Sequence, residues 1–375
     1  MVPALKRFFL IAGEPSGDRL GAALMAGLKS LTAVEFHGIG GPMMMAEGLT
    51  SLFPMAELSV MGLVEVVPKY FPLKRRIAEA AAAALALKPD AVITIDSPDF
   101  CLRVASIVKA ANPGQRMIHY VAPSVWAWRP GRAAKMAGVI DHVLALLPFE
   151  PPFMTAAGMT CDFVGHPVVA EPLATPAERA LMDGPRPLIL ALPGSRKGEV
   201  TRLAPVIGQA LALILKAHPQ ARVALPTLAH VAGLVRNLTA PWPVRPQIIE
   251  DPILKRAVFA AADVAIAASG TVSLELAACQ VPMVIAYQMH PVSFWLTRRA
   301  MLIDTVTLVN LVSETRTVPE FIGPACRPDL IADAVLALLS DRRSQDDAMS
   351  LTMQRLGLGG EAPGLRAARS VLSHL

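Results

Sequence analysis

The sequence predicts an α/β protein of two doubly wound domains, and two glycine-bearing turns carry that prediction. In each, a short apolar run breaks into a glycine turn and then into a helix. The first run is 8–12 with its turn at 13–18, and the second is 188–192 with its turn at 193–196. Such turns place free backbone N–H groups at the carboxyl end of a buried strand, where anions and nucleotides bind. Because each turn lies near the start of its own βα series, we expect two domains with the active site in the cleft between them.

Length and composition limit the possible classes of protein. The 375 residues can form two domains with separate cores, and 53% of them are hydrophobic. The longest uncharged span, 276–297, is broken by two prolines and fits a strand with its flanks, and the apolar run after Arg7 is too short for a signal peptide. Four scattered cysteines without metal-ligand spacing indicate reduced, cytoplasmic thiols. A net charge of +5 fits anionic substrates or an anionic membrane surface, and it argues little for nucleic acid.

Apolar runs recur along the chain, and because they are continuous they predict strands buried on both faces of parallel sheets. We expect strands at 8–12, 34–39, 91–95, 116–121, 142–147, 161–164, 188–192, 222–225, 247–249, 264–268 and 283–287. Helices are expected from about Leu20, over 74–88 and 100–111, and from about Glu199. Prolines crowd the stretch 165–187. This pattern predicts domains 1–165 and 188–345, a linker 166–187 and a helical C-terminal segment 346–375.

Two carboxylates in the first half are candidates for chemistry. Asp96 directly follows the expected strand 91–95, where it could take a proton from a hydroxyl group. Equally, Asp96 or Ser97 could cap a helix that begins near Pro98, and position alone favours neither interpretation. Glu14, in the first glycine turn, could hold a sugar hydroxyl or close the turn, and the structural role has a slight advantage.

The second half offers a candidate site for a nucleotide diphosphate. Arg196 follows Gly194 and Ser195 at the turn, and its guanidinium suits a diphosphate, although it could instead pair with Glu199 on the surface. After the expected strand 264–268, the next turn residues could admit a phosphate, and an acid on the following helix could accept bonds from ribose hydroxyls. These residues are Ser269, Gly270, Thr271 and Glu275. An ordinary capping arrangement would look the same.

Two further segments combine aromatic or apolar residues with polar ones. The segment 119–132 contains Trp126 and Trp128, which could line a pocket or form a hydrophobic plug. The stretch 60–76 joins apolar residues to a basic flank, a pattern found in membrane interfaces, although alone it more often marks a core-facing helix.

Taken together, the segments resemble the lipid-A-disaccharide synthases, which are inverting glycosyltransferases of GT-B architecture. The resemblance covers about residues 8 to 325, and HYVAPSVWAWR and SVMGLVEV are its most specific motifs. The motifs are AGEPSGD (12–18), GIGGPMM (38–44), SVMGLVEV (59–66), IDSPDF (95–100), HYVAPSVWAWR (119–129), LPFE (147–150), GHP (165–167), LPGSR (192–196), ASGTVSLE (268–275) and TLVNL (307–311).

The resemblance implies transfer of 2,3-diacylglucosamine from UDP to 2,3-diacylglucosamine 1-phosphate, with formation of a β(1→6) disaccharide. It makes Asp96 the general base, and Glu14 and Arg196 the other catalytic residues. The UDP site would comprise Gly194, Ser195, Arg196, Ser269, Gly270, Thr271, Glu275 and Asn310. The acceptor pocket would include Ser16, Met61, Ser124 and Trp126. Because Arg196 and a helix N-terminus can stabilise the leaving diphosphate, we expect no metal and no other cofactor.

The acyl chains of both substrates imply an enzyme at the inner face of the inner membrane. This favours membrane docking by part of 60–76, namely Val66, Val67, Phe71, Lys74, Arg75 and Arg76, with 294–296 beside Arg298 and Arg299 as a weaker second candidate. In this fold a last helix often crosses back to the first domain, and a homodimer is left open. The alternatives are another GT-B enzyme, such as a UDP-N-acetylglucosamine 2-epimerase, and a membrane-bound nucleotide-sugar sensor without turnover. The first would lack HYVAPSVWAWR, and the second would be expected to lose Asp96.

Overall fold

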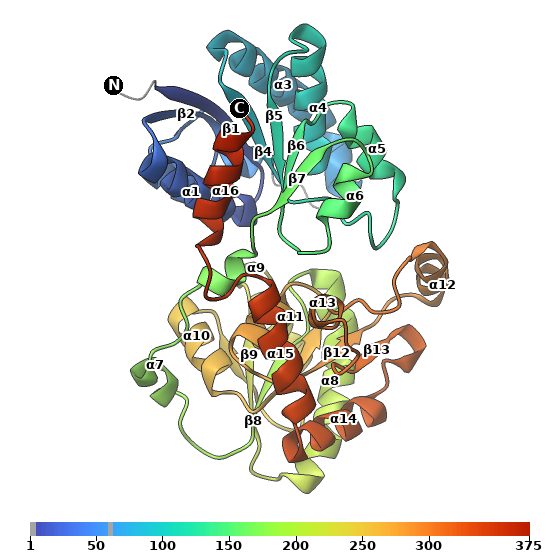
Figure 1. The fold of residues 1–375 in the computed structure, drawn as a ribbon. Coiled ribbons are helices and arrows are strands. Elements are labelled where there is room, and N and C mark those ends of the chain that lie inside the picture. The colour runs from blue at the N-terminus through green and yellow to red at the C-terminus, as the bar shows by residue number, and fades with distance from the viewer. Residues whose placement is uncertain (1–4, 59–62) are drawn as a thin grey trace. The chain divides into compact units, whose positions relative to one another are not determined.

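A computed structural model of the chain describes residues 5–58 and 63–375, except for the side chains of 63–70 and 291–293. The chain forms two compact α/β units (Figure 1). Met1–Ala170 and Gly359–Leu375 make up the first unit, and Glu171–Leu358 make up the second. Each unit has its own parallel sheet and its own core. The prediction of two parallel-sheet α/β domains is therefore confirmed.

The division between the units differs from the expected boundaries. The proline-rich stretch expected as a linker is shared, because the first unit ends at Ala170. Within this stretch, Pro176–Ala180 form helix α7, which begins at a capping box between Thr175 and Glu178. The C-terminal segment is also divided, since α15 (Arg343–Arg355) belongs to the second unit and α16 (Pro363–Ser373) to the first.

The first unit has a seven-stranded parallel sheet of order β3-β2-β1-β4-β5-β6-β7. Its strands are β1 (Lys6–Ala12), β2 (Val34–Ile39), β3 (Thr50–Ser51), β4 (Ala91–Ile95), β5 (Met117–Tyr120), β6 (His142–Ala145) and β7 (Thr160–Phe163). Its other helices are α1 (Pro15–Leu31), α2 (Pro42–Ala46), η1 (Met55–Glu57), α3 (Leu63–Leu87), α4 (Pro98–Ala111), α5 (Gly131–Ala137), α6 (Pro151–Thr155) and η2 (Pro167–Ala170). The sheet is buried on both faces, as continuous apolar strands require.

Alternate residues of β1 point to opposite faces and build two cores. Phe8 and Leu10 belong to the core under α1 and α16, whereas Phe9 and Ile11 belong to the core under α3 and α4. Helices α1 and α16 run side by side (Figure 1). Their backbones approach closely at Gly364, where a Cβ would lie 2.5 Å from the carbonyl oxygen of Ala23. The last helix is therefore an integral layer of the first unit.

The second unit has a six-stranded parallel sheet of order β10-β9-β8-β11-β12-β13. Its strands are β8 (Leu188–Leu192), β9 (Arg222–Pro226), β10 (Gln247–Ile249), β11 (Val264–Ala268), β12 (Met283–Tyr287) and β13 (Glu320–Ile322). Its other helices are α8 (Lys197–Ala217), α9 (Ala229–Thr239), α10 (Pro252–Ala261), α11 (Val272–Ala278), α12 (Pro291–Ala300), α13 (Leu308–Ser313), η3 (Gly323–Ala325) and α14 (Pro328–Ser340).

Helix α8 is, among the described residues, the one helix long and apolar enough to span a membrane. Its buried face, including Leu203 and Ile207, packs into the core of the second unit, and Pro205 lies inside it. These are the features of a core helix.

The eleven expected strands are all present, with ends that differ by up to two residues. Strands β3 and β13 were missed because two or three residues show no hydrophobic period. Helix α1 begins at Pro15 and not at Leu20, since proline is favoured in the first turn. Helix α3 begins eleven residues before the expected Lys74, at Leu63, although Pro68 and Pro72 fall within it.

Candidate active site

Both sheets have a topological switch point, where neighbouring strands continue in opposite directions across the sheet. In the first unit this point lies between β1 and β4, and in the second between β8 and β11. Ligands of open α/β sheets bind beside such points, at the carboxyl ends of the strands. Glu14 follows β1 and Asp96 follows β4, whereas Arg196 follows β8 and Ser269 follows β11. Four of the predicted site residues therefore flank the two switch points.

Asp96 has a strained backbone. Its φ is 51°, and that of Ser97 is 44°, so two consecutive residues other than glycine adopt the left-handed region. The backbone N–H of Asp96 donates to the carbonyl of Tyr120 at 2.9 Å, which holds the turn against the end of β5. Ser97 is the N-cap residue of α4 but makes no side-chain capping bond. The capping interpretation is thus not supported, and strain of this kind is typical of functional positions.

The carboxylate of Asp96 is half-buried and makes no hydrogen bond or ion pair with the part of the chain that the structure describes. The loops after β1 and β4 touch, because a Cβ on Gly13 would lie 2.5 Å from Oγ of Ser97. A side chain at position 13 would therefore require Ser97 to shift. Glu14, which follows Gly13, is half-buried and is the N-cap residue of α1 without a side-chain capping bond, and Ser16 is exposed in the first turn of α1. Glu14, Ser16 and Asp96 thus belong to one edge of the sheet.

Asp18, a residue of the motif AGEPSGD, has a structural role. It is buried, and its carboxylate accepts hydrogen bonds from the backbone N–H groups of Gly41 (2.8 Å), Met43 (3.0 Å) and Met44 (3.0 Å). Helix α2 begins at Gly41-Pro42 and has no capping side chain of its own, so Asp18 caps it from α1. The motifs AGEPSGD and GIGGPMM are thereby joined into one structural pair.

We expect Asp18→Ala to lower the free energy of unfolding of the first unit by about 2 kcal/mol or more, since three backbone N–H groups, two of them in buried hydrogen bonds, lose their acceptor. Hydrogen exchange in α2, together with urea denaturation, measures the effect. The exposed Glu35, changed to Gln, is the matched control and should change stability little. Equal stability of the two variants would contradict the capping role.

Trp126 is held by Glu150, the buried acid of the motif LPFE. Its indole N–H donates to Oε1 of Glu150 at 3.2 Å, and its ring meets Phe149 edge-on at 5.1 Å. Glu150 also accepts from the N–H groups of Leu146 and Leu147. Burial raises the pKa of Glu150 to about 7, although the three N–H donors favour its ionised form. Glu150, for which no role is predicted from the motif LPFE, therefore fixes Trp126 in place.

The neighbours of Trp126 are more open. Ser124 is exposed, and Trp128 is 41% exposed with the guanidinium of Arg129 stacked 4.2 Å from its ring. Ser124 and Trp126 follow β5, which is the neighbour of β4. These two residues of the expected acceptor pocket lie at the same sheet edge as Asp96. Met61, also expected there, lies outside the described residues.

Arg196 begins α8 and pairs with Glu199 at 3.3 Å, while its side chain remains 68% exposed. Oε2 of Glu199 accepts from the backbone N–H groups of Ser195 (3.2 Å) and Arg196 (3.3 Å). Gly194 has a φ of 111°, and a Cβ there would lie 2.6 Å from the same oxygen. The turn after β8 thus already binds one carboxylate through its N–H groups, and the guanidinium, paired with this same carboxylate at 3.3 Å, is exposed enough to meet a second anion.

The turn after β11 is open at Gly270, where a Cβ would meet nothing within 4 Å and φ is 149°. Ser269 is half-buried and Thr271 is exposed at the start of α11. Glu275 lies one turn further and pairs with Lys255 of α10 at 2.6 Å. The structure therefore leaves room for a ligand beside this turn, and it gives Glu275 an ion-pair partner that the sequence pattern does not predict.

Asn310 has a structural role, which corrects the expectation that it lines the UDP site. It is 1% exposed, and its amide exchanges two hydrogen bonds with the backbone of Val318, at 2.9 and 3.0 Å. The amide also donates to Oγ1 of Thr305 at 3.3 Å. Because both amide hydrogens are used inside the fold, Asn310 orders the TLVNL segment and does not present its side chain to a ligand.

The expected membrane-docking residues divide into two groups. Phe71 is 80% exposed, and Lys74 and Arg75 are exposed on α3. Arg76 is not available for docking, because it pairs with Glu57 and Glu79 and stacks 4.4 Å from the ring of Phe53. The side chains of Val66 and Val67 lie outside the described residues.

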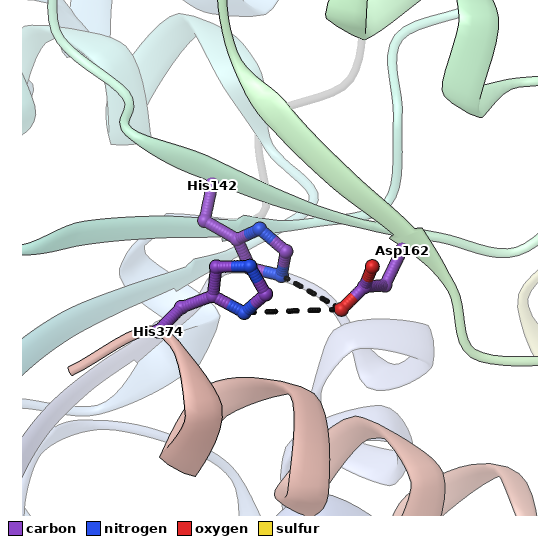
Figure 2. Close-up of side chains that lie close together, drawn as sticks. All are labelled: His142, Asp162 and His374. Carbon is purple, nitrogen blue, oxygen red and sulfur yellow. Dashed lines mark ion pairs between the residues drawn. The ribbon is translucent and has the colours of Figure 1, made fainter.

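A cluster of His142, Asp162 and His374 is the group of metal-ligating residue types found in the described part of the chain (Figure 2). The two imidazole rings stack at 3.7 Å and nearly parallel, at 14°. Both ring nitrogens of His142 are already used, by Thr160 and by Ser370, each at 2.8 Å. A metal between stacked rings would lie out of both ring planes, so the cluster does not fit a metal as it stands. Instead it joins α16 to β6 and β7.

This cluster should make the attachment of α16 sensitive to acid. Burial lowers the pKa of His142 to about 4, despite the pull of Asp162, so the unfolded chain binds its proton more readily. The contribution of His142 to the free energy of unfolding is complete above pH 6.5. It is then lost as the pH falls toward 4, by at most about 1.4 kcal/mol per pH unit. The protection factors of amides in α16, which correct hydrogen exchange for its intrinsic pH dependence, should fall over that range in the wild type and less so in His142→Gln. The same pH dependence in both would contradict this account.

Comparison with known proteins identifies the family. The sequence profile described as lipid-A-disaccharide synthetase matches residues 8–364. The chain belongs to this family. A lipid-A-disaccharide synthase of Ruegeria pomeroyi is 62% identical, and the match covers 99% of this chain and 96% of that protein. One from Rhodospirillum centenum is 46% identical, over 97% of this chain and 94% of that protein. The resemblance found in the motifs is thereby confirmed, and the chain is a glycosyltransferase of lipid A biosynthesis.

Solved structures share the fold at low identity. A putative UDP-N-acetylglucosamine 2-epimerase of Listeria monocytogenes has a TM-score of 0.67 at 16% identity, over 99% of this chain and 95% of that chain. MurG of Acinetobacter baumannii has a TM-score of 0.56 at 15% identity, over the full length of both chains. At such identities the likeness concerns the fold alone. The shared fold confirms that this chain has the GT-B architecture.

Proposed function

We propose that the chain transfers 2,3-diacylglucosamine from UDP to the 6-hydroxyl of 2,3-diacylglucosamine 1-phosphate, with inversion, giving a β(1→6) tetraacyl disaccharide 1-phosphate and UDP. The observation that carries this proposal is Asp96, a half-buried carboxylate on a strained turn at the switch point of the first sheet. Family membership indicates the reaction, and Asp96 offers a carboxylate that can act as its general base.

Asp96 acts as the general base. An inverting transfer requires removal of the acceptor proton as its oxygen attacks the anomeric carbon from the face opposite UDP. The carboxylate has no partner among the described residues that would neutralise it, and the backbone hydrogen bond to Tyr120 fixes its turn. We propose that Glu14, which follows Gly13 in the loop that meets Ser97, holds a sugar hydroxyl beside it.

The leaving diphosphate is stabilised by the turn after β8. Arg196 offers an exposed guanidinium, and the N–H groups of Ser195 and Arg196 already donate hydrogen bonds to one anion, the carboxylate of Glu199. We propose that diphosphate oxygens take this place and that Ser269, Gly270 and Thr271 border the UDP moiety. A guanidinium and backbone dipoles supply the positive charge, so we propose a transfer without metal or other cofactor.

The two sets of residues belong to different units, so the reaction requires the units to act together. We propose that both sets of residues take part in the one transfer. Glu275 would hold the ribose hydroxyls after exchanging its partner Lys255 for the ligand. Ser16, Ser124 and Trp126 would line the acceptor side, with Met61 as the further candidate.

The test is a transfer assay with purified protein and mass spectrometry of the products. With UDP-2,3-diacylglucosamine and the diacyl 1-phosphate acceptor, we expect a tetraacyl disaccharide 1-phosphate and UDP. With UDP-N-acetylglucosamine as donor, we expect neither transfer nor epimerisation. Turnover of UDP-N-acetylglucosamine alone would overturn the proposal in favour of another GT-B activity, and UDP binding without any turnover would favour a sensor.

The enzyme works in the cytoplasm in association with the membrane, as its family implies, and we propose the inner face of the inner membrane as its place. Phe71, Lys74 and Arg75 are exposed together on α3 and suit an anionic leaflet.

Replacing Lys74 and Arg75 by Ser should weaken binding to anionic vesicles by roughly tenfold or more, since each basic residue near such a surface contributes about 1 kcal/mol. Vesicle sedimentation measures the change. The exposed Lys135 and Lys216, changed to Ser, form the matched control, because they remove the same charge elsewhere. Equal binding by the two double variants would show that Lys74 and Arg75 have no specific part in membrane binding.

A further inference from the structure

We infer that the second unit has a membrane contact of its own, made by the α12 patch, which we define as Trp295, Leu296, Arg298, Arg299 and Leu302. The occupant we assign is the headgroup and upper acyl region of an anionic bilayer. The inference rests on the proposed function, because the donor sugar carries acyl chains that the second unit would have to accommodate beside its UDP site. It adds a contact distinct from the one proposed on α3.

The α12 patch gathers large apolar side chains in the open. Trp295 is 56% exposed, Leu296 is 56% exposed and Leu302 is 61% exposed. They fall within eight residues of sequence, and in Figure 1 helix α12 stands away from the sheet of its own unit. Other exposed leucines of this unit, such as Leu228 and Leu330, occur singly. A concentration of exposed apolar groups is typical of an interaction surface and not of ordinary solvent exposure.

The charge of the α12 patch selects the kind of partner. Arg298 and Arg299 are exposed, α12 contains no acidic residue, and the guanidinium of Arg299 stacks 4.7 Å from the ring of Trp295. Asp304, the next acid along the chain, is already paired with Arg316 at 2.5 Å. Tryptophan and arginine together suit the boundary between headgroups and acyl chains, where the ring enters the interface and the cation meets phosphate. The patch therefore complements an anionic lipid surface.

Helix α12 is attached to its unit in a way that leaves this face uncovered. Phe294 is half-buried and packs against Gly323, where a Cβ would lie 2.6 Å from the ring. Gly323 has a φ of 59°, so glycine is favoured there for both backbone and space. Phe294 thus anchors the helix to η3, while Trp295 and Leu296 remain outside.

The position of α12 links the patch to the donor. Helix α12 follows β12, whose carboxyl end lies at the same sheet edge as those of its neighbour β11 and of β8. Arg202 of α8, two turns after Arg196, donates to the carbonyl of Gln288 at 3.1 Å and ties the segment before α12 to that helix. The segment that leads into α12 and the turn that carries Arg196 therefore lie at the same sheet edge of the second unit, where the proposed donor diphosphate would bind.

The test compares Trp295→Ser/Leu296→Ser with Leu173→Ser/Leu181→Ser, a control that removes two exposed apolar residues elsewhere in the second unit. The probe is a vesicle of phosphatidylcholine containing phosphatidylglycerol. We expect the first double variant to lose about tenfold in vesicle binding, and the control to bind as the wild type does. We also expect brominated lipids to quench the fluorescence of the wild type more than that of Trp295→Phe.

Turnover of substrates dispersed in detergent separates this inference from the proposed function. We expect the Trp295→Ser/Leu296→Ser variant to keep wild-type turnover in detergent while losing vesicle binding. Unchanged vesicle binding, or an equal loss of vesicle binding in the control, would contradict a membrane contact at the α12 patch, whatever the turnover in detergent. A wild type that binds vesicles through Trp295 but transfers no sugar would contradict only the proposed function. Quenching that is the same in Trp295→Phe would show that Trp295 does not enter the bilayer and would overturn the lipid assignment.

Discussion

Asp96→Asn is expected to fold normally, to bind UDP as the wild type does, and to lose turnover by at least two orders of magnitude. The amide of asparagine cannot take the proton from the 6-hydroxyl of the acceptor sugar. Removal of a general base lowers turnover by roughly this factor. The backbone of residue 96 is left-handed, with a φ of 51°, and asparagine tolerates that region as well as aspartate does. Loss of turnover would therefore reflect lost chemistry and not a changed turn.

Asp99→Asn is the matched control, since Asp99 is an exposed acid in the first turn of α4, three residues away. Initial rates at saturating substrate, with UDP affinity measured by calorimetry, separate catalysis from binding. Near-normal rates for Asp96→Asn with low rates for Asp99→Asn would move the base to Asp99. Near-normal rates for both would move suspicion to Glu14.

Arg196→Ala is expected to weaken UDP binding by roughly tenfold to a hundredfold and to lower turnover further, because a guanidinium–diphosphate contact contributes about 1.5–3 kcal/mol. The side chain is 68% exposed, and its ion pair with Glu199 is a surface pair of small value, so stability should change little. Calorimetric titration with UDP measures the effect.

Lys197→Ala is the control for charge alone, because Lys197 is the next residue, is exposed and makes no ion pair within the described parts of the chain. Glu199→Gln adds a second comparison. It removes the anion that the N–H groups of Ser195 and Arg196 now hold, so UDP affinity should be equal or higher. If Arg196→Ala and Lys197→Ala weakened UDP binding equally, the guanidinium would have no specific role.

The strand ends, and with them most of the candidate site, could be predicted because two-sided burial produces continuous apolar runs. Asp96 and Arg196 were found because each stands at the point where such a run stops. Strand order is not visible in those runs, so the placing of Glu14 beside Asp96 at one switch point emerges only from the sheet.

The misassigned residues have physical reasons of their own. Asn310 and Arg76 carry side chains that suit a ligand or a membrane, but tertiary partners use them instead: Val318 for the first, Glu57 and Glu79 for the second. A single sequence does not reveal such pairings. The role of Asp18 could have been predicted in part. Helix α2 begins at Gly41-Pro42 without a capping side chain, so its first N–H groups require a hydrogen-bond acceptor from elsewhere.

Sequence patterns also do not show that the C-terminal segment is divided between the two units. Helices α15 and α16 are both amphipathic and close in the chain, yet they belong to different units. What distinguishes α16 is specific, namely the approach of Gly364 to Ala23 and the bond from Ser370 to Asp162 at 2.7 Å. These contacts depend on shape and not on hydrophobic period.

The measurement that tests the central claim most directly is the configuration of the product that the purified chain forms in the presence of EDTA. Proton NMR of the new anomeric centre reports the stereochemistry, and the rate with and without chelator reports any need for a metal. The account predicts a β(1→6)-linked tetraacyl disaccharide 1-phosphate, formed at the same rate in both conditions. An α-linked product would contradict the in-line attack assisted by Asp96, and a requirement for divalent cation would contradict the role given to Arg196.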